Sequence, residues 1–216
     1  MKKQRESTLV LALFVAFVFS MAVILPGTAM AGPPAFVEKT GQTVSYAVGD
    51  DGEYQAGVDL PSPRFTDNGD GTVTDNLTRL IWLKNANCFG GRTWYEALSD
   101  ANQLADESCD LTDGSVPGDW RLPNVKEMMS LIHYGYGFPS LSNAEGTGQW
   151  SEGNAFSRVM DDDYYWSSTT DALEPGIAYV PHFSRGLVRR SYKATNVRYV
   201  WPVRGGRTFD SIDTIE

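Results

Sequence analysis

Three aspartates between residues 65 and 76 have the type and spacing that could bind a calcium ion. Asp67, Asp70 and Asp75 stand among glycines and asparagines in the stretch FTDNGDGTVTDN. A helix–loop–helix calcium loop takes oxygen ligands at alternating positions and a carboxylate at its twelfth position. Here the twelfth position is Leu77, which offers no side-chain oxygen, and the flanks are strand-like. Asn-Gly and Asp-Gly pairs favour tight hairpin loops. We therefore expect a β-hairpin, with a weak cation site as the alternative.

Two cysteines, Cys88 and Cys109, offer the next possible chemistry. In an oxidising compartment an even cysteine count predicts a disulfide. Closing a loop of about 22 residues would stabilise the fold by about 3 kcal/mol on the chain-entropy model. A catalytic or metal-binding pair is the alternative, but the sequence has no C-x-x-C spacing and no histidine nearby.

Few other residues are arranged for catalysis. His133 and His182 have no neighbours at metal-ligand spacing; we expect a capping or surface role for His133, whereas His182 could face a ligand. Ser167 and Ser168 lack an evident base and are expected to be buried hydroxyls. The acidic run 161–163 is expected in a solvated loop, with cation binding as the alternative, because consecutive side chains of an extended chain point in different directions. We predict no enzyme activity, cofactor or metal.

The distribution of charge is more informative than any motif. Between residues 175 and 209 the chain has no acidic residue but seven basic ones: Arg185, Arg189, Arg190, Lys193, Arg198, Arg204 and Arg207. Aromatic residues are interspersed among them. Such a segment could receive an anionic polymer or an acidic protein surface. The alternatives are that these cations pair with acidic residues of the same fold, or that they serve subunit contacts.

The first 31 residues have the pattern of a cleaved signal peptide. Three basic residues precede an apolar run over residues 9–25, and small residues at 29–31 allow cleavage after Ala31. A retained membrane anchor is the alternative, because this run is near the lower length limit for a span. No cysteine follows the run within the signal region, which argues against a lipid anchor. We expect a periplasmic or secreted protein without stable membrane insertion after cleavage.

Removal of the signal would change the formal net charge from −9 to −11, because residues 1–31 hold three basic residues and one acidic residue. This acidity argues against nucleic acid as a partner. The remaining length suits one domain with a single core. We expect an extended lead-in over residues 32–62, a domain over 63–207 and a C-terminal tail over 208–216.

Two short helices and several strands must position these residues. In TWYEALSDANQLAD and PNVKEMMSLIHY the apolar residues follow helical spacing. Thr93 with Glu96, and Asn124 with Glu127, form capping boxes that mark the helix starts. The segments TRLIWLKN, DYYWSSTT, GIAYVPHFS, GLVRRSYK and VRYVWPVRG favour strands, and one more strand is expected at Thr43–Val48. This order of elements predicts an α+β fold.

Several of these segments together resemble a known family. RFTDNGDGTVTDNLTRLIWLKNANC, PGDWRLPNVKEM, YYWSSTT and RYVWPVRGG are similar, in this order, to the C-terminal domain of the Legionella collagen-like adhesin. The resemblance covers about residues 39–206. It implies a C-type-lectin-like fold, in which two short helices lie beside a small antiparallel sheet with long loops.

The resemblance also implies a function. The adhesin domain binds sulfated glycosaminoglycans and forms a trimer, and related lectin-like binders place their ligand contacts in the final strands and loops. We therefore predict a non-catalytic binding module for a glycan, an anionic polymer or a protein surface. The candidate ligand-binding residues are Tyr165, Trp166, Tyr179, His182, Arg185, Arg189, Arg190, Lys193 and Arg198.

Two departures from the family bear on this prediction. The chain has no collagen repeat, so stalk-driven trimerisation is not supported, although a homo-oligomer formed in another way is left open. Formylglycine-generating enzymes of related fold use a reactive cysteine pair near the C-terminal end, whereas here both cysteines flank the first helix. A formylglycine-generating activity is the less favoured alternative. The other alternative is a structural cell-envelope component that acts by self-assembly or docking.

Overall fold

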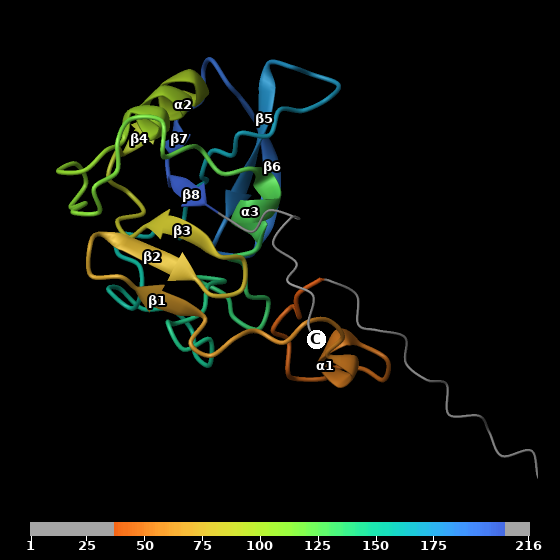
Figure 1. Ribbon diagram of the computed structural model, residues 1–216. Helices are drawn as coiled ribbons and strands as arrows, with labels where there is room; N and C mark the ends of the chain where they lie inside the picture. Colours follow the sequence, from red (N-terminus) through yellow and green to blue (C-terminus); the bar gives the residue numbers. More distant parts are fainter. Residues whose placement is uncertain (1–36, 206–216) are drawn as a thin grey trace, which may run out of the picture. The chain divides into compact units, whose positions relative to one another are not determined.

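The computed structural model describes residues 37–205, so the predicted signal peptide and the C-terminal tail lie outside the described residues. Its largest sheet has four antiparallel strands in the order β1-β2-β3-β8 (Figure 1). The strands span Phe65–Asp67, Thr72–Asp75, Leu80–Leu83 and Val203–Gly205. The sheet therefore joins the start of the domain to its last strand.

Two smaller antiparallel sheets and three helices complete the described fold. Strand β4 (Gly91–Arg92) pairs with β7 (Arg198–Tyr199), and β5 (Ile177–His182) pairs with β6 (Leu187–Tyr192). The helices are α1 (Asp51–Tyr54), α2 (Trp94–Gln103) and α3 (Val125–Met129). Short helices with small antiparallel sheets confirm the predicted α+β class.

The aspartate-rich stretch forms the expected hairpin. Strands β1 and β2 pair antiparallel, and Gly69 and Gly71 in the loop have φ angles of 77° and 84°. A Cβ atom on Gly71 would lie 2.4 Å from the carbonyl oxygen of Asp110, so this position also requires a glycine for close packing. The Asp70 carboxylate accepts hydrogen bonds from the backbone N–H and the hydroxyl of Thr72.

Both predicted capping boxes are confirmed. Thr93 caps α2 with Glu96, and Asn124 caps α3 with Glu127. These reciprocal bonds satisfy amide groups that the first turn leaves without partners. Helix α3 ends at Met129, earlier than the apolar spacing suggested, because the following residues form turns.

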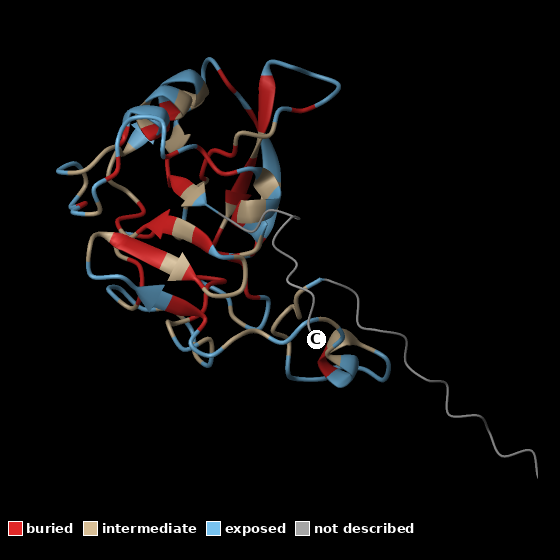
Figure 2. Cartoon of the chain, in the orientation of Figure 1, coloured by how far each residue is buried: buried red, intermediate tan, exposed pale blue. Residues whose placement is uncertain are grey.

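Large aromatic side chains fill the core. Trp82, Phe156, Tyr165 and Trp201 are each 0% exposed, and the rings of Phe156, Tyr165 and Trp82 all contact Trp201 at centroid distances of 4.9–5.6 Å. Figure 2 shows buried residues concentrated along β2, β3 and β5, while β6 is largely exposed. Edge-to-face and tilted contacts of this kind add stability beyond the buried area alone.

A buried ion pair joins the hairpin to α3. The Arg64 guanidinium donates two hydrogen bonds to the Asp75 carboxylate, at 3.1 and 3.0 Å, and a third to the Ser130 carbonyl at 2.8 Å. Both partners of the pair are nearly inaccessible to solvent, with exposed fractions of 3% and 0%. Asp75 therefore has a structural role at the end of β2.

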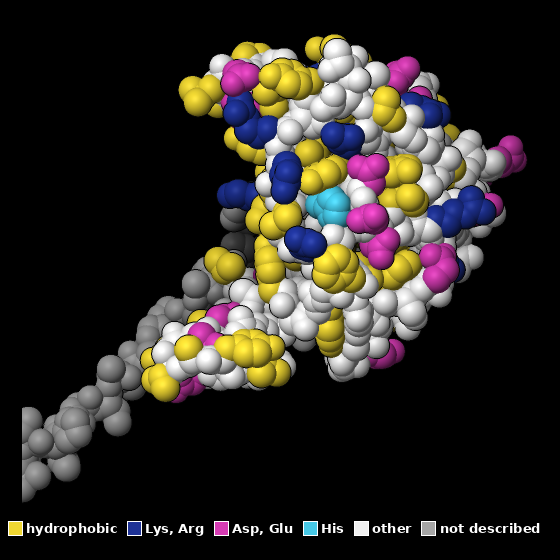
Figure 3. Space-filling view, turned by 180° about the vertical axis from the view of Figure 1, so that it is seen from behind, with side chains coloured by type: hydrophobic (Ala, Val, Ile, Leu, Met, Phe, Trp, Pro, Cys, Tyr) yellow, Lys and Arg dark blue, Asp and Glu magenta, His cyan; other side chains and the backbone are white. Residues whose placement is uncertain are grey.

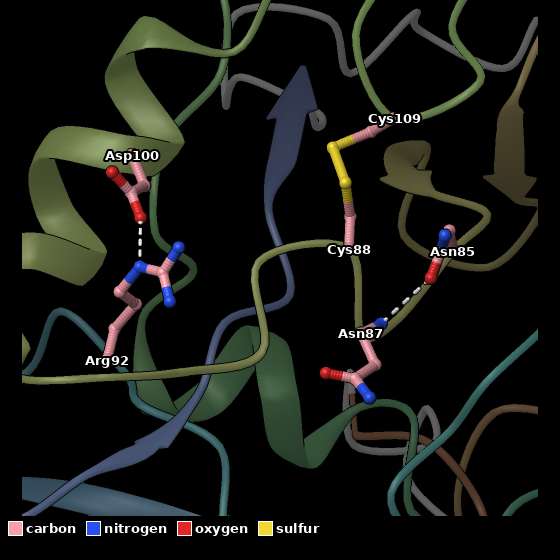
Figure 4. The surroundings of a disulfide bond; sticks show 6 residues. All are labelled: Asn85, Asn87, Cys88, Arg92, Asp100 and Cys109. Atoms are coloured by element: carbon pink, nitrogen blue, oxygen red, sulfur yellow. Dashed lines mark hydrogen bonds and ion pairs between the residues drawn. A yellow bond between two sulfur atoms is a disulfide. The ribbon is translucent and has the colours of Figure 1, made fainter.

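The predicted disulfide is confirmed. Cys88 and Cys109 are bonded, with their Cα atoms 5.7 Å apart (Figure 4). The bond ties the loop after β3 to the loop that follows α2. The ion pair between Arg92 and Asp100, at 2.6 Å, holds β4 to α2.

The lead-in differs from expectation. Thr43–Val48 forms bends and turns, so the predicted strand is wrong, and a short helix, α1, follows instead. Asp50 caps α1 by accepting from the Glu53 N–H, a local bond that competes with an extended conformation. Across the part of the chain that the structure describes, no helix has the length and apolar character required to cross a membrane.

Candidate functional site

The basic segment folds into the β5–β6 ribbon, where strand alternation separates its arginines. Val180 pairs with Arg189, and Tyr179 pairs with Arg190. Residues opposite one another share a face of the ribbon, and consecutive residues point to opposite faces. Arg189 therefore shares a face with His182, whereas Arg190 shares the other face with Tyr179. The sequence segment does not form a single basic face.

Three of its cations are engaged inside the fold. Arg190 pairs with Asp171 at 2.7 Å and with Glu174 at 2.9 Å, and Arg204 pairs with Asp113 at 2.9 Å. Lys193 is only 4% exposed. Its ammonium donates to the Thr170 hydroxyl at 2.6 Å and lies 3.8 Å from the centre of the Trp94 ring. For Lys193 the prediction of an exposed ligand contact is wrong, because the side chain is buried against α2.

Three other arginines of the segment have no carboxylate partner within Val37–Gly205. They are Arg185, Arg189 and Arg198. Arg185 lies over the Phe138 ring and Arg198 over the Tyr164 ring, both at 5.3 Å. Internal pairing is therefore confirmed for some cations of the segment only: Arg190, Arg204 and Lys193 are engaged within the fold, and the other three described cations of the segment have no carboxylate partner among residues 37–205. Arg207 lies outside the described residues.

An aromatic stack adjoins the available arginines. The rings of Tyr164 and His182 meet edge to face with centroids 4.5 Å apart, and Arg198 covers the Tyr164 ring. A buried Arg198 nitrogen, Nε, has no hydrogen-bond partner among the described residues. Leu187, opposite His182 in the ribbon, is 39% exposed. We name the surface of Tyr164, His182, Leu187, Arg189 and Arg198 the ribbon face.

The charge pattern on this side of the molecule is mixed. Figure 3 shows Lys and Arg side chains separated by acidic and hydrophobic ones, without a continuous basic patch. Asp163 immediately precedes Tyr164, and its carboxylate accepts from the Tyr164 N–H at 2.7 Å. The arginines of the ribbon face are therefore separate cations with a carboxylate nearby.

Tyr165 and Trp166 are not exposed, which corrects the prediction that they contact ligand. Both are 0% exposed. The Tyr165 hydroxyl accepts from the Met160 N–H at 2.6 Å, and the Trp166 indole donates to the Arg92 carbonyl at 2.7 Å. Burial raises the pKa of Tyr165 far above its ordinary value. Their segment lies along β5 through isolated bridges, and only Tyr164 is turned towards His182.

His133 is buried, so the expectation of a capping or surface residue is wrong. It is 8% exposed and stacks on Tyr136 with ring centroids 4.4 Å apart. Burial, and then the charge of Arg64, lower its pKa. Its partners are residues of the lead-in and of the loop after α3, which the helical pattern around it did not reveal.

The segment that contains the ribbon face matches a known protein family. Residues 71–204 match the Lcl C-terminal domain. The chain is a member of this family. No curated protein matches it. Within this Lcl C-terminal domain lie β2, both disulfide cysteines and the whole ribbon face, whereas the described lead-in lies before it.

The described residues contain no cluster of metal-ligating side chains. No group of three or more His, Cys, Asp or Glu side chains that could hold a metal ion occurs within residues 37–205. Ser167 is buried as expected, and its hydroxyl donates to the Tyr179 carbonyl at 2.7 Å. Asp67 pairs with Lys84 at 2.5 Å. These polar groups have structural partners in the fold.

Sequence reasoning missed Tyr164 and Leu187 as members of the ribbon face. Tyr164 stands beside Tyr165 and Trp166, and in an extended segment alternation places Tyr164 and Trp166 on the same side. Alternation therefore does not distinguish Tyr164 from the buried Trp166. Leu187 is identified by its pairing with His182, which depends on the strand register.

Proposed function

We propose that this Lcl C-terminal domain protein is an exported, non-catalytic binding module that holds an anionic glycan on the ribbon face. The observation that supports it best is the exposed Arg189 beside the Tyr164–His182–Arg198 stack. The resemblance to an adhesin domain, and the predicted signal peptide, agree with a binding role outside the cytoplasm. Neither identifies the ligand.

The geometry suits a sugar that carries separated negative charges. Arg189 and Arg198 offer planar donors that match sulfate or carboxylate oxygens. The rings of Tyr164 and His182 and the exposed side chain of Leu187 offer apolar surface beside those donors. Because the interaction relies on exposed charges, added salt should weaken it. A protein partner with spaced acidic residues would meet the same requirements less fully, since it lacks the apolar C–H faces of sugar rings.

Two neighbouring arginines provide a matched test. Arg189 and Arg190 are adjacent and exposed, but within residues 37–205 only Arg190 has carboxylate partners. Retention on a heparin column at low salt should fall for Arg189→Ala and stay near the wild-type value for Arg190→Ala. We expect the loss to correspond to about 1 kcal/mol, the upper range for an exposed charge pair.

Equal elution of the two variants, or no retention of the wild-type protein at low salt, would contradict an anionic ligand on the ribbon face. Arg190→Ala should instead reduce thermal stability slightly, because Asp171 is 4% exposed and would lose a partner. This separates a folding effect from a binding effect. A glycan array then distinguishes sulfated from uronic-acid ligands.

A structural role by self-assembly is a second candidate. It is favoured by two apolar residues near the ribbon, Tyr192 and Val197, which are 59% and 52% exposed. Light scattering after size exclusion should report an oligomer if this surface joins copies of the chain. A monomer at high concentration, together with heparin retention, would leave ligand binding as the function.

A further inference from the structure

A polar cavity lies away from the ribbon face. It has a volume of about 400 Å³, which is within the range of small-molecule sites. Four stretches that are far apart in the sequence line it: residues 39–43, 51–60, 133–136 and 146–147. The first two belong to the lead-in before the matched family segment. The domain and the lead-in thus contribute to one cavity.

Two glycines allow these stretches to meet. A Cβ atom on Gly41 would lie 2.2 Å from the His133 ring, and one on Gly135 would lie 2.3 Å from the Gly41 carbonyl oxygen. Gly41 also has a φ angle of 87°. The backbones of the two stretches are also hydrogen-bonded, because the Tyr134 N–H donates to the Thr40 carbonyl at 2.8 Å. Only residues without side chains permit this approach.

The cavity wall holds one ion pair and one further carboxylate. Lys39 pairs with Asp59 at 2.5 Å, and the Thr40 hydroxyl donates to the Asp51 carboxylate. His133 is the remaining titratable wall residue besides Tyr136, and burial together with Arg64 lowers its pKa, so the neutral ring is favoured. An anionic ligand would therefore find no unpaired cation in this wall to offset its lost hydration, whereas the Asp51 carboxylate can accept hydrogen bonds from hydroxyl groups.

The uncharged wall groups are suited to hydroxyls and to a ring. Gln55, Thr43 and Thr147 supply amide and hydroxyl groups that both donate and accept, and Gln42, whose amide N–H groups donate to Val44 and Asp50, supplies an acceptor oxygen. The stacked rings of His133 and Tyr136, inclined by only 18°, supply aromatic carbon at the same cavity. Amides, hydroxyls and carboxylates around an aromatic wall match a compact molecule with many hydroxyl groups and apolar C–H faces.

We propose that this cavity binds a neutral saccharide unit, at a site separate from the anionic ligand of the ribbon face. The two sites differ in charge dependence. Binding in the cavity should be insensitive to salt, because it forms hydrogen bonds and aromatic contacts between uncharged groups. The proposal stands independently of the ribbon face, since no residue is shared between the two surfaces.

Isothermal calorimetry with three neutral probes, cellobiose, maltotriose and N,N′-diacetylchitobiose, tests the proposal on the purified protein. At least one probe should bind, with the same affinity at low and high sodium chloride. Tyr136→Leu should weaken that binding roughly three- to tenfold, as expected for the loss of one aromatic contact. Tyr54→Leu is the matched control, because Tyr54 is a 71% exposed lead-in tyrosine that does not line the cavity.

A second variant protects against a folding artefact. Gln55→Ala removes one amide from a half-buried position at the end of α1 and should also weaken binding. Failure of all three probes to bind, or wild-type affinity in both Tyr136→Leu and Gln55→Ala, would overturn the proposal. Arg189→Ala should keep its saccharide affinity. A protein that binds a neutral probe but is not retained on heparin would contradict only the ribbon-face proposal. The two proposals can therefore fail separately.

Discussion

The ribbon face and the cavity formed with the lead-in both contain basic side chains, but these differ in whether they have carboxylate partners. On the ribbon face, Arg189 and Arg198 lack carboxylate partners among the described residues, whereas in the cavity Lys39 is paired with Asp59. The ribbon face depends on strand register, and the cavity depends on loops that meet from distant parts of the chain. Pairing, more than the count of charges, therefore decides which ligand class a surface can take.

The largest effect should come from the buried ion pair of Arg64 and Asp75. Arg64→Met would leave the Asp75 carboxylate buried without its cation, and we expect the free energy of unfolding to fall by about 3–5 kcal/mol. Urea denaturation measures the change. Lys126→Met, on α3, is the control, because Lys126 has no carboxylate partner among the described residues. An equal loss of stability in Arg64→Met and Lys126→Met would contradict the role of the ion pair.

Removing the disulfide should be the next largest effect. The double variant Cys88→Ser and Cys109→Ser lacks a link across 21 positions, and we expect a loss of about 3 kcal/mol in unfolding free energy. Thermal unfolding by circular dichroism measures it. Because neither cysteine belongs to the ribbon face or lines the cavity, ligand affinities of the folded variant should not change. Altered affinity would indicate a coupling that the structure does not contain.

A glycine variant should separate the two surfaces. In Gly41→Ala the new methyl group would collide with the His133 ring and the positive φ would be strained, at a cost of about 1–3 kcal/mol for that conformation. Hydrogen exchange of the Tyr134 N–H should become faster, and heparin retention should not change.

The control for that experiment is Gly69→Ala. Gly69 has a φ angle of 77°, but no atom lies within 4 Å of the position that a methyl group would occupy, so the variant has the strain without the collision. Slower or unchanged exchange of the Tyr134 N–H in Gly41→Ala would contradict the role of Gly41 in bringing the cavity stretches together. Equal acceleration in Gly69→Ala would attribute the effect to general destabilisation.

The smallest effect should be a pH dependence confined to the lead-in. Burial raises the pKa of Glu38 to about 7, against opposing attraction from Arg64. A raised pKa means that Glu38 stabilises the fold below its unfolded pKa of 4.5, and this contribution is lost as the pH rises through about 7. Glu38→Gln should therefore gain stability relative to wild type between pH 4.5 and 7. A constant difference across that window, measured by chemical denaturation, would contradict this assignment.

Local patterns predicted the elements that depend on neighbouring residues. The capping boxes at Thr93 and Asn124 form within one helical turn, and the hairpin of β1 and β2 depends on turn residues between the strands. The disulfide followed from the cysteine count and the expected compartment. In each case the relevant partner is close in sequence or is the only candidate of its type.

The C-terminal third was predicted less well, because burial there depends on distant partners. Tyr165 and Trp166 have the same strand-forming character as Tyr164, and nothing local distinguishes the exposed ring. Their burial follows from packing against Trp201 and from the bond to the Arg92 carbonyl. Lys193 was likewise expected to be exposed, but the Trp94 ring and Thr170 hold it.

The sequence by itself determined the α+β class, the helix starts, the hairpin, the disulfide and the concentration of basic residues after residue 175. These depend on residue type, spacing and composition, which the linear chain contains. Only the tertiary structure decided that Arg190 is neutralised while Arg189 has no carboxylate partner among the described residues, that His133 is buried and that the lead-in completes a cavity. Each of these outcomes depends on which distant backbone or carboxylate comes within a few ångströms, a distance that no local pattern specifies.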